Sequence, residues 1–306
     1  MPNATLEALP NVRQKQFDEA NARFWNELCG TALARAIGIS DQSHESVKKF
    51  DDAYFAMYPY LLPIVRPEEM EGKSVLEIGL GYGSLSQKLA EAGADYTGMD
   101  IAAGPVQMVN DRLGIVGLPG RALQGNALDM PFSDDSFDFL VSIGCFHHTG
   151  NVQRCLDETY RVLKPGGRCV VMLYNKFSFR QWRSRPWTTF RELFRDFFVS
   201  VRRLEDDRLR GEYDRHLDGE AAPEVTLHSM RELRRRFRRF RSVRIQKQNC
   251  DPILKLQNRG TFRDRVVEKL GRSWALENLY GWIPRERLLS TLGRRLGLDL
   301  YVRAQK

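Results

Sequence analysis

The fold is decided by the stretch Val75-Leu-Glu-Ile-Gly-Leu-Gly-Tyr-Gly83, a short apolar run that contains one acid and leads into a glycine-rich turn. Such a run predicts a strand buried in a parallel sheet. Glycines allow the backbone to turn sharply and let a ligand approach it closely. The following segment, 84–90, predicts the start of a helix. Together these parts predict a strand–turn–helix unit with a nucleotide-like ligand on the turn, although NAD and FAD proteins also carry a Gly-x-Gly turn.

The rest of the unit follows in a fixed order. Residues 95–100 predict a second strand that ends in Asp100, roughly 20 residues after the turn, where an acid can accept both hydroxyls of a ribose. The later parts are Gly125-Asn126-Ala127, a strand over 137–143, Cys145-Phe-His-His148, a helix over 152–163, Lys164-Pro-Gly-Gly167 and a strand over 168–174.

This ordered set resembles the class I S-adenosylmethionine (SAM) dependent methyltransferases, in particular their small-molecule, methyltransferase type 11-like branch. The resemblance covers about Lys73 to Asn175, and residues 298–304 look like the last strand of the same sheet. It implies a Rossmann-like α/β sheet of seven strands, mostly parallel with the last strand antiparallel, and helices on both faces. A nicotinamide-binding protein is the alternative, but its motif is Gly-x-Gly-x-x-Gly, and it leaves the later motifs unexplained.

Four blocks are predicted along the chain. Residues 1–70 form a helical N-terminal extension, because their apolar residues recur at helical spacing. Residues 71–175 are the SAM-binding core, and residues 176–228 are a helical insertion that acts as a lid. Residues 229–306 complete the sheet and contain a second helical insertion at about 252–295, which also contributes to the lid.

The composition favours a globular protein of the reducing cytoplasm. Five cysteines in 306 residues show no paired spacing, so disulfides, zinc and redox motifs are not expected. The N-terminus does not resemble a signal peptide, and no apolar run is long enough to span a membrane. The net charge of +8 is compatible with anionic partners.

The resemblance implies SAM as cofactor, S-adenosylhomocysteine as product and no metal. Glu77 then meets the amino group of the methionine moiety, and Asp100 holds the ribose hydroxyls, whereas in isolation both could be surface acids. By the same resemblance, Gly79, Gly81 and Gly83 supply close backbone contact to the cofactor, and Ile101, Asn126 and Ala127 contact adenine. Ile143 offers its carbonyl to the amino group, and Tyr58 contacts the SAM carboxylate.

The acceptor side is less determined. His147 and His148 follow a strand that points at the methyl group, and a neutral histidine is a natural general base. Alternatively, the pair only closes over the cofactor or packs against the next helix. Tyr54, Tyr174 and Trp187 are the candidate substrate residues.

Two segments combine basic and aromatic residues. In 231–240 the apolar residues share one helical face, which favours a surface helix packed on the sheet over an RNA-binding or membrane-binding patch. Trp187, Phe190 and Phe194 form an apolar stripe flanked by arginines, which favours a lid over the substrate pocket, with a membrane contact as the alternative.

The expected function is methyl transfer to a small-molecule or lipid-like acceptor, which the charge allows to be anionic. An RNA-modifying enzyme and a non-catalytic SAM-binding protein are the alternatives. The sequence leaves open the methylated atom and the oligomeric state.

Overall fold

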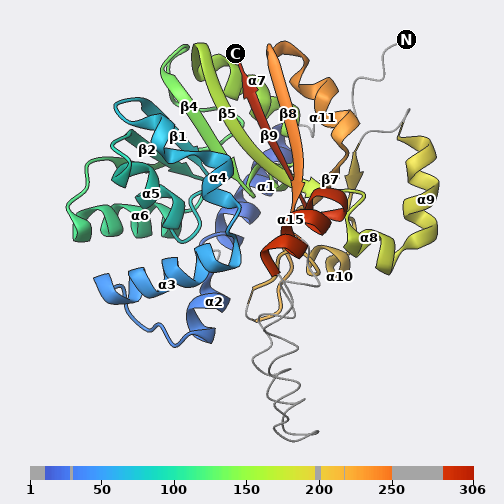
Figure 1. Cartoon of the computed structure of the whole chain (residues 1–306), viewed down its shortest axis with the longest axis horizontal. Helices are drawn as coiled ribbons and strands as arrows, with labels where there is room; N and C mark the ends of the chain where they lie inside the picture. The colour runs from blue at the N-terminus through green and yellow to red at the C-terminus, as the bar shows by residue number, and fades with distance from the viewer. Residues whose placement is uncertain (1–10, 28–29, 197–200, 217, 250–284) are drawn as a thin grey trace, which may run out of the picture.

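The computed structural model describes residues 11–27, 30–196, 201–216, 218–249 and 285–306. A single sheet runs through the molecule with helices on both sides (Figure 1). Its strands are β1 (Ser74–Ile78), β2 (Asp95–Asp100), β3 (Arg121–Gln124), β4 (Phe137–Ile143), β5 (Leu163–Asn175), β6 (Arg202–Arg203), β7 (Thr226–His228), β8 (Ser242–Gln248) and β9 (Asp299–Gln305).

The strand order creates the ligand-binding edge. The sheet runs β3-β2-β1-β4-β5 with all neighbours parallel, and β9 then pairs antiparallel with β5 and with β8. The order reverses between β1 and β4, and open α/β sheets bind ligands where the strand order reverses, at the carboxyl ends of the strands. The predicted mixed sheet, with its last strand antiparallel, is confirmed.

In the described part of the chain the sheet has nine strands rather than the seven expected. The two additional strands lie in residues 176–228, which we expected to contain no sheet. β7 pairs parallel with the last residues of β5, and β6 pairs antiparallel with β7. These strands are only two and three residues long, too short to leave a pattern in the sequence.

Helices lie on both faces of the sheet (Figure 1). The helices of the described residues are α1 (Asn11–Phe24), α2 (Thr31–Ala36), α3 (His44–Met57), α4 (Leu61–Val65), α5 (Ser84–Glu91), α6 (Ala103–Val116), α7 (Val152–Val162), α8 (Phe179–Ser184), α9 (Pro186–Arg195), α10 (Asp207–Arg210), α11 (Met230–Arg236) and α15 (Arg285–Leu296). Three short 3-10 helices are η1 (Pro67–Met70), η2 (Phe146–His148) and η3 (Phe237–Arg239). Most of the second predicted insertion, residues 250–284, lies outside the described part of the chain.

Two apolar cores form because strand side chains alternate between the faces. Leu76 and Ile78 of β1 belong to the core shared with α7 and α11, whereas Val75 belongs to the core shared with α4, α5 and α6. The apolar face of the arginine-rich segment 231–240 is buried as predicted, since Leu233 and Phe237 are fully covered.

A third, smaller core joins two of the predicted blocks. Phe24 at the end of α1 packs with residues of the insertion, namely Leu204, Ala222, Val225 and Leu227. The N-terminal extension and the insertion therefore support one another beside the carboxyl edge of the sheet.

A buried arginine fixes the glycine turn to its surroundings. Arg112 of α6 is 1% exposed, and its guanidinium donates to Asp51 Oδ2 of α3 at 2.6 Å. It also donates to the carbonyl of Tyr82 in the turn at 2.8 Å and to the side chain of Gln87 at 3.1 Å. One side chain thus connects α3, α6 and the turn.

We expect Asp51→Asn to lower the free energy of unfolding by about 3 kcal/mol, because it leaves a buried guanidinium without its counter-charge. The matched control is Asp52→Asn in the same helix, whose ion pair with Lys48 is 68% exposed on both sides and should matter little. Urea unfolding of both variants measures the difference. Equal effects would show that Arg112 does not depend on its carboxylate partner.

Candidate active site

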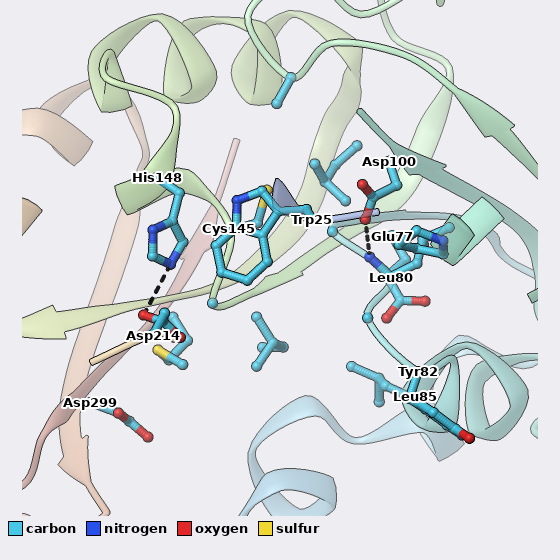
Figure 2. A pocket seen from close by; sticks show the side chains of 18 of the residues that line it. Trp25, Glu77, Leu80, Tyr82, Leu85, Asp100, Cys145, His148, Asp214 and Asp299 are labelled. Atoms are coloured by element: carbon cyan, nitrogen blue, oxygen red, sulfur yellow. Dashed lines mark hydrogen bonds and ion pairs between the residues drawn. The ribbon is translucent and has the colours of Figure 1, made fainter. Parts of the chain in front are cut away.

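A cavity of about 400 Å³ opens at the carboxyl ends of β1, β2, β4 and β5. Figure 2 shows Glu77 and Asp100 near the glycine turn on one side, and His148 with Asp214 on the other. Of the residues predicted from the sequence, those that line it are Tyr54, Tyr58, Glu77, Gly79, Gly81, Gly83, Asp100, Ile101, Asn126, Ala127, Ile143, His148 and Tyr174. His147 and Trp187 are not among the lining residues.

The turn after β1 requires glycine. Gly79, Gly81 and Gly83 all have positive φ angles, of 82°, 54° and 80°. A Cβ at Gly79 would also lie 2.5 Å from the Cβ of Cys145. At Gly79 the turn is therefore packed against Cys145, after β4, with no room for a side chain.

Asp100 is held by the backbone around it. Its Oδ2 accepts from the amide of Leu80 in the turn at 2.8 Å, and its Oδ1 accepts from the amide of Ala102 at 2.9 Å. Burial raises the pKa of Asp100 to about 6, against the lowering effect of these hydrogen bonds. A carboxylate oxygen has further lone pairs, so both oxygens can still accept from a ligand.

Glu77 is a second buried acid that lines the cavity. Its Oε2 accepts from the hydroxyls of Ser86 at 2.6 Å and Tyr96 at 2.7 Å. Burial nevertheless raises the pKa of Glu77 to about 7, and the nearby charge of Asp100 acts in the same direction. Two buried acids at one cavity favour a ligand that carries a positive charge.

Asn126 lies at the cavity with its side chain held by the protein. Its Oδ1, predicted to accept from adenine, accepts from the amide of Leu128 at 2.9 Å and keeps a second lone pair for a ligand. Its amide nitrogen donates to Asp18 Oδ2 of α1 at 2.7 Å. Asp18 also lines the cavity, so a carboxylate from the N-terminal extension adds to the site, a contribution not predicted from the sequence.

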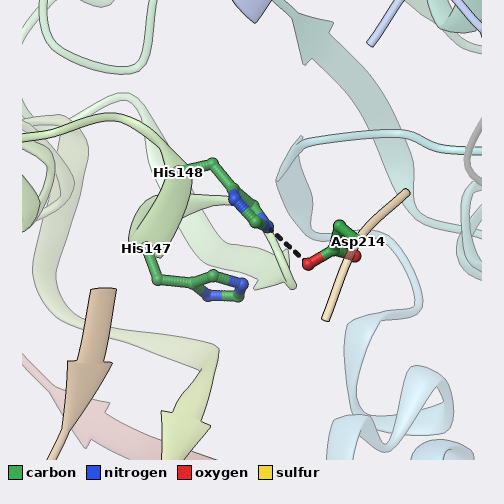
Figure 3. Close-up of side chains that lie close together, drawn as sticks. All are labelled: His147, His148 and Asp214. Atoms are coloured by element: carbon green, nitrogen blue, oxygen red, sulfur yellow. Dashed lines mark ion pairs between the residues drawn. The ribbon is translucent and has the colours of Figure 1, made fainter. Parts of the chain in front are cut away.

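His148 has a defined orientation. Its Nδ1 lies 2.6 Å from the carbonyl oxygen of Glu224, which can only accept, so Nδ1 carries a proton. Its Nε2 lies 3.5 Å from Oδ2 of Asp214 (Figure 3). Burial lowers the pKa of His148, while the carboxylate of Asp214 acts against that shift. The ring of Trp25 lies 4.7 Å away, centroid to centroid.

His147 has a different environment from its neighbour. It is 0% exposed, and its carbonyl accepts from the hydroxyl of Thr226 at 3.0 Å. Its ring packs 4.1 Å from that of Tyr174, and burial holds its pKa well below the usual range. Of the two predicted base candidates, only His148 reaches the cavity.

The insertion contributes polar residues that the sequence did not single out. Asp214 accepts from the hydroxyl of Tyr174 at 3.1 Å, besides facing His148. Arg180 and Tyr213 from the same insertion also line the cavity. These positions carry no signal in the sequence, because they follow no motif and approach the cavity only through the fold.

Trp187, a candidate substrate residue, does not line the cavity. It is 84% exposed, and none of the residues lining the cavity comes from α9. The expected lid is therefore not formed by the aromatic stripe of this helix. The physical reason is that α9 packs on the protein through polar side chains, of which Thr189 is fully buried.

One group beside the cavity has donor atoms close enough for a metal ion. His147, His148 and Asp214 can each offer an atom within 4.8 Å of the others. Since Nδ1 of His148 binds the carbonyl of Glu224, only its Nε2 is available for such a bond.

Comparison with known proteins identifies the central segment. A family described as "Methyltransferase domain" matches residues 76–171. The chain is 38% identical over 101 residues to a demethylmenaquinone methyltransferase of Tropheryma whipplei, a match that covers 33% of this chain and 41% of that protein. It is also 38% identical over 101 residues to a fatty-acid O-methyltransferase of Mycolicibacterium smegmatis, covering 32% and 36% of the two chains. The chain thus spans less than half the length of these curated relatives.

Among solved structures, the fold resembles that of a Haemonchus contortus phosphoethanolamine N-methyltransferase bound to S-adenosylhomocysteine. The TM-score is 0.51 at 17% identity, and the match covers 84% of this chain and 57% of that one. This likeness concerns the fold.

The raised pKa of Glu77 predicts a pH-dependent effect on stability. Between its ordinary pKa of 4.5 and its folded value of about 7, the folded protein holds a proton that the unfolded chain has released. Relative to Glu77→Gln, the wild type should therefore lose stability, on the order of 3 kcal/mol, as the pH rises from about 4.5 through 7.

Urea unfolding at pH 5 and pH 8 measures this difference, and Glu68→Gln, at an exposed acid, serves as the control. A wild type that gains stability relative to Glu77→Gln on raising the pH would contradict the assignment.

Proposed function

From the premise that residues 76–171 form a class I SAM-dependent methyltransferase domain, we propose that this chain transfers a methyl group from SAM to a small-molecule or lipid-like acceptor. The observation that carries the proposal is the pairing of the glycine turn with two buried acids, Glu77 and Asp100, at one cavity.

The donor set fits SAM. Asp100 is held by backbone amides with both oxygens at the cavity edge, which suits a ribose diol. Glu77 carries a destabilised charge that the ammonium or sulfonium of SAM would compensate. Gly79, Gly81 and Gly83 let the ligand approach the backbone closely.

The other lining residues have corresponding roles. Ile101 would pack on adenine, the amide of Ala127 would donate to the ring, and the Asn126–Asp18 pair would accept from the adenine amine. The carbonyl of Ile143 would accept from the amino group. Tyr58 would contact the carboxylate of SAM from the other side of the cavity.

When bound, SAM supplies a methyl group already activated by its sulfonium, so the protein mainly has to position the acceptor, and positioning can supply several kcal/mol. The cavity walls beyond the glycine turn include Trp25, Met57, Leu61, Met172 and Leu298. Apolar walls of this kind suit the ring or chain of a lipid-like acceptor.

The acceptor end points to an acceptor that loses a proton, a hydroxyl or an amine. Because Nδ1 of His148 donates to the carbonyl of Glu224, the neutral ring has its lone pair on Nε2. That atom can take the proton of the nucleophile, and Asp214 at 3.5 Å would stabilise the imidazolium that forms. Tyr54 and Tyr174 lie in the same cavity and would position the acceptor, and Arg180 would attract an anionic group on it.

The names of the relatives support the acceptor class. One relative methylates demethylmenaquinone and another a fatty acid. The names therefore support a lipid-like acceptor for this chain, whereas the ionisable oxygen or nitrogen that we propose on it rests on the geometry of His148.

We expect methyl-labelled SAM to deliver label into the lipid or small-molecule fraction of an extract of the source cells. Asp100→Asn should weaken SAM binding by about tenfold, since the NH2 end of asparagine cannot accept from a backbone amide or a ribose hydroxyl where a carboxylate oxygen does. Calorimetry measures the affinity, and Asp95→Asn, an exposed acid on the same strand, is the control.

Label in RNA instead would show that RNA is the substrate. Bound SAM without transfer to any fraction would favour the non-catalytic alternative. Unchanged affinity in Asp100→Asn would remove the assigned cofactor site.

His148→Gln should lower the initial rate of label incorporation by about 10²-fold, because it removes the proton acceptor, and should leave SAM affinity nearly unchanged. His44→Gln, at an exposed histidine of α3, is the control. Asp214→Asn should also slow methyl transfer. It should lower the pKa of His148 that the pH dependence of the transfer rate reports, because the imidazolium loses its counter-charge. Normal turnover in His148→Gln would exclude the histidine as base.

A further inference from the structure

Helix α9 presents its apolar side to solvent. Four large apolar side chains on one side of this ten-residue helix are far more exposed to solvent than apolar side chains of this size usually are. They are Trp187 at 84%, Phe190 at 49%, Leu193 at 45% and Phe194 at 65% exposure, and we call them the α9 face.

The opposite side of α9 is polar and anchored. Thr189 is fully buried and donates to the carbonyl of Gln181 at 3.1 Å. Asp196, directly after the helix, accepts from the buried ammonium of Lys176 at 2.7 Å. These contacts fix the orientation of the helix, so the α9 face cannot turn inward without breaking a buried ion pair.

The α9 face has a basic border. Arg191 and Arg195 are exposed along one side of it, and Arg183 is exposed on the preceding helix. The acid within α9, Glu192, points away from this face and lies 3.5 Å from Arg202. The helix also lies at the periphery of the molecule, away from the sheet (Figure 1).

We propose that the α9 face is a docking surface for an anionic lipid bilayer. Aromatic side chains between arginines suit the boundary between head groups and acyl chains, where the rings enter and the guanidinium groups pair with phosphates. A second copy of this chain is a poorer occupant, because a two-fold contact would bring the same arginines together. No helix in the described residues is long and apolar enough to cross a membrane, so the contact is peripheral.

The proposal rests on α9 itself and not on the identity of the acceptor. It would place the enzyme against the phase in which a lipid-like acceptor resides, but the docking test needs no turnover.

The test is sedimentation of the full chain with vesicles of phosphatidylcholine alone and of phosphatidylcholine mixed equally with phosphatidylglycerol. We expect binding only to the mixed vesicles, with a blue shift of tryptophan fluorescence that Trp187→Phe removes. Arg191→Gln/Arg195→Gln should weaken binding by about tenfold or more, since each arginine near an anionic surface contributes to the attraction. Trp187→Ala/Phe194→Ala should abolish binding.

The control is Ile115→Ala, which removes an apolar side chain that is 49% exposed on α6, outside the α9 face. SAM affinity and thermal unfolding report whether each variant is folded, and the arginine variant keeps the test decisive should the aromatic variant unfold. Failure of the wild type to bind mixed vesicles would overturn the proposal. So would protection of Trp187 from acrylamide in the free protein, or a concentration-dependent dimer that Trp187→Ala/Phe194→Ala abolishes.

Discussion

The geometry of the cofactor turn depends on the buried guanidinium of Arg112. A buried charge is tolerated only where its hydrogen bonds and counter-charge are supplied, and here α3, α5 and the turn supply them. The same region is tightened by the stacking of Phe50 on Tyr82, with ring centroids 3.9 Å apart. The N-terminal extension is therefore part of the support of the turn, and not a separate cap above it.

Local patterns determined what could be predicted from the sequence. The run at β1, the glycine turn and Asp100 were predictable because strand burial and turn chemistry are short-range. Together with the later motifs they carry the family resemblance, which implied the class of fold and the cofactor residues that line the cavity. Asp18, Arg112 and Asp214 were not predictable, because each is a polar residue in an ordinary helical or irregular segment. Asp18 meets Asn126 across 108 residues, and such a contact has no signature in either segment alone.

The orientation of two features could not be predicted from the sequence, for one physical reason. A paired motif such as His147-His148 does not say which ring faces the cavity, and η2 turns one toward β5 and the other toward the insertion. Likewise, the apolar stripe of α9 indicates an amphipathic helix but not which side is buried. Here the polar side binds the protein through Lys176 and Asp196, so the usual orientation is reversed.

The charge of the whole chain and the charge of its cavity have opposite signs. The net charge is +8, yet the charged side chains lining the cavity are mostly acids, namely Asp18, Glu77, Asp100, Asp214 and Asp299, alongside Arg180 and the ionisable His148. The net charge therefore describes the outer surface, where the arginines of α9 and α11 are exposed, and says little about the ligand. Inside, buried carboxylates with raised pKa values are most stabilised by a cation, as in a sulfonium cofactor. One chain can thus hold a positively charged cofactor in its cavity while its exterior attracts an anionic surface.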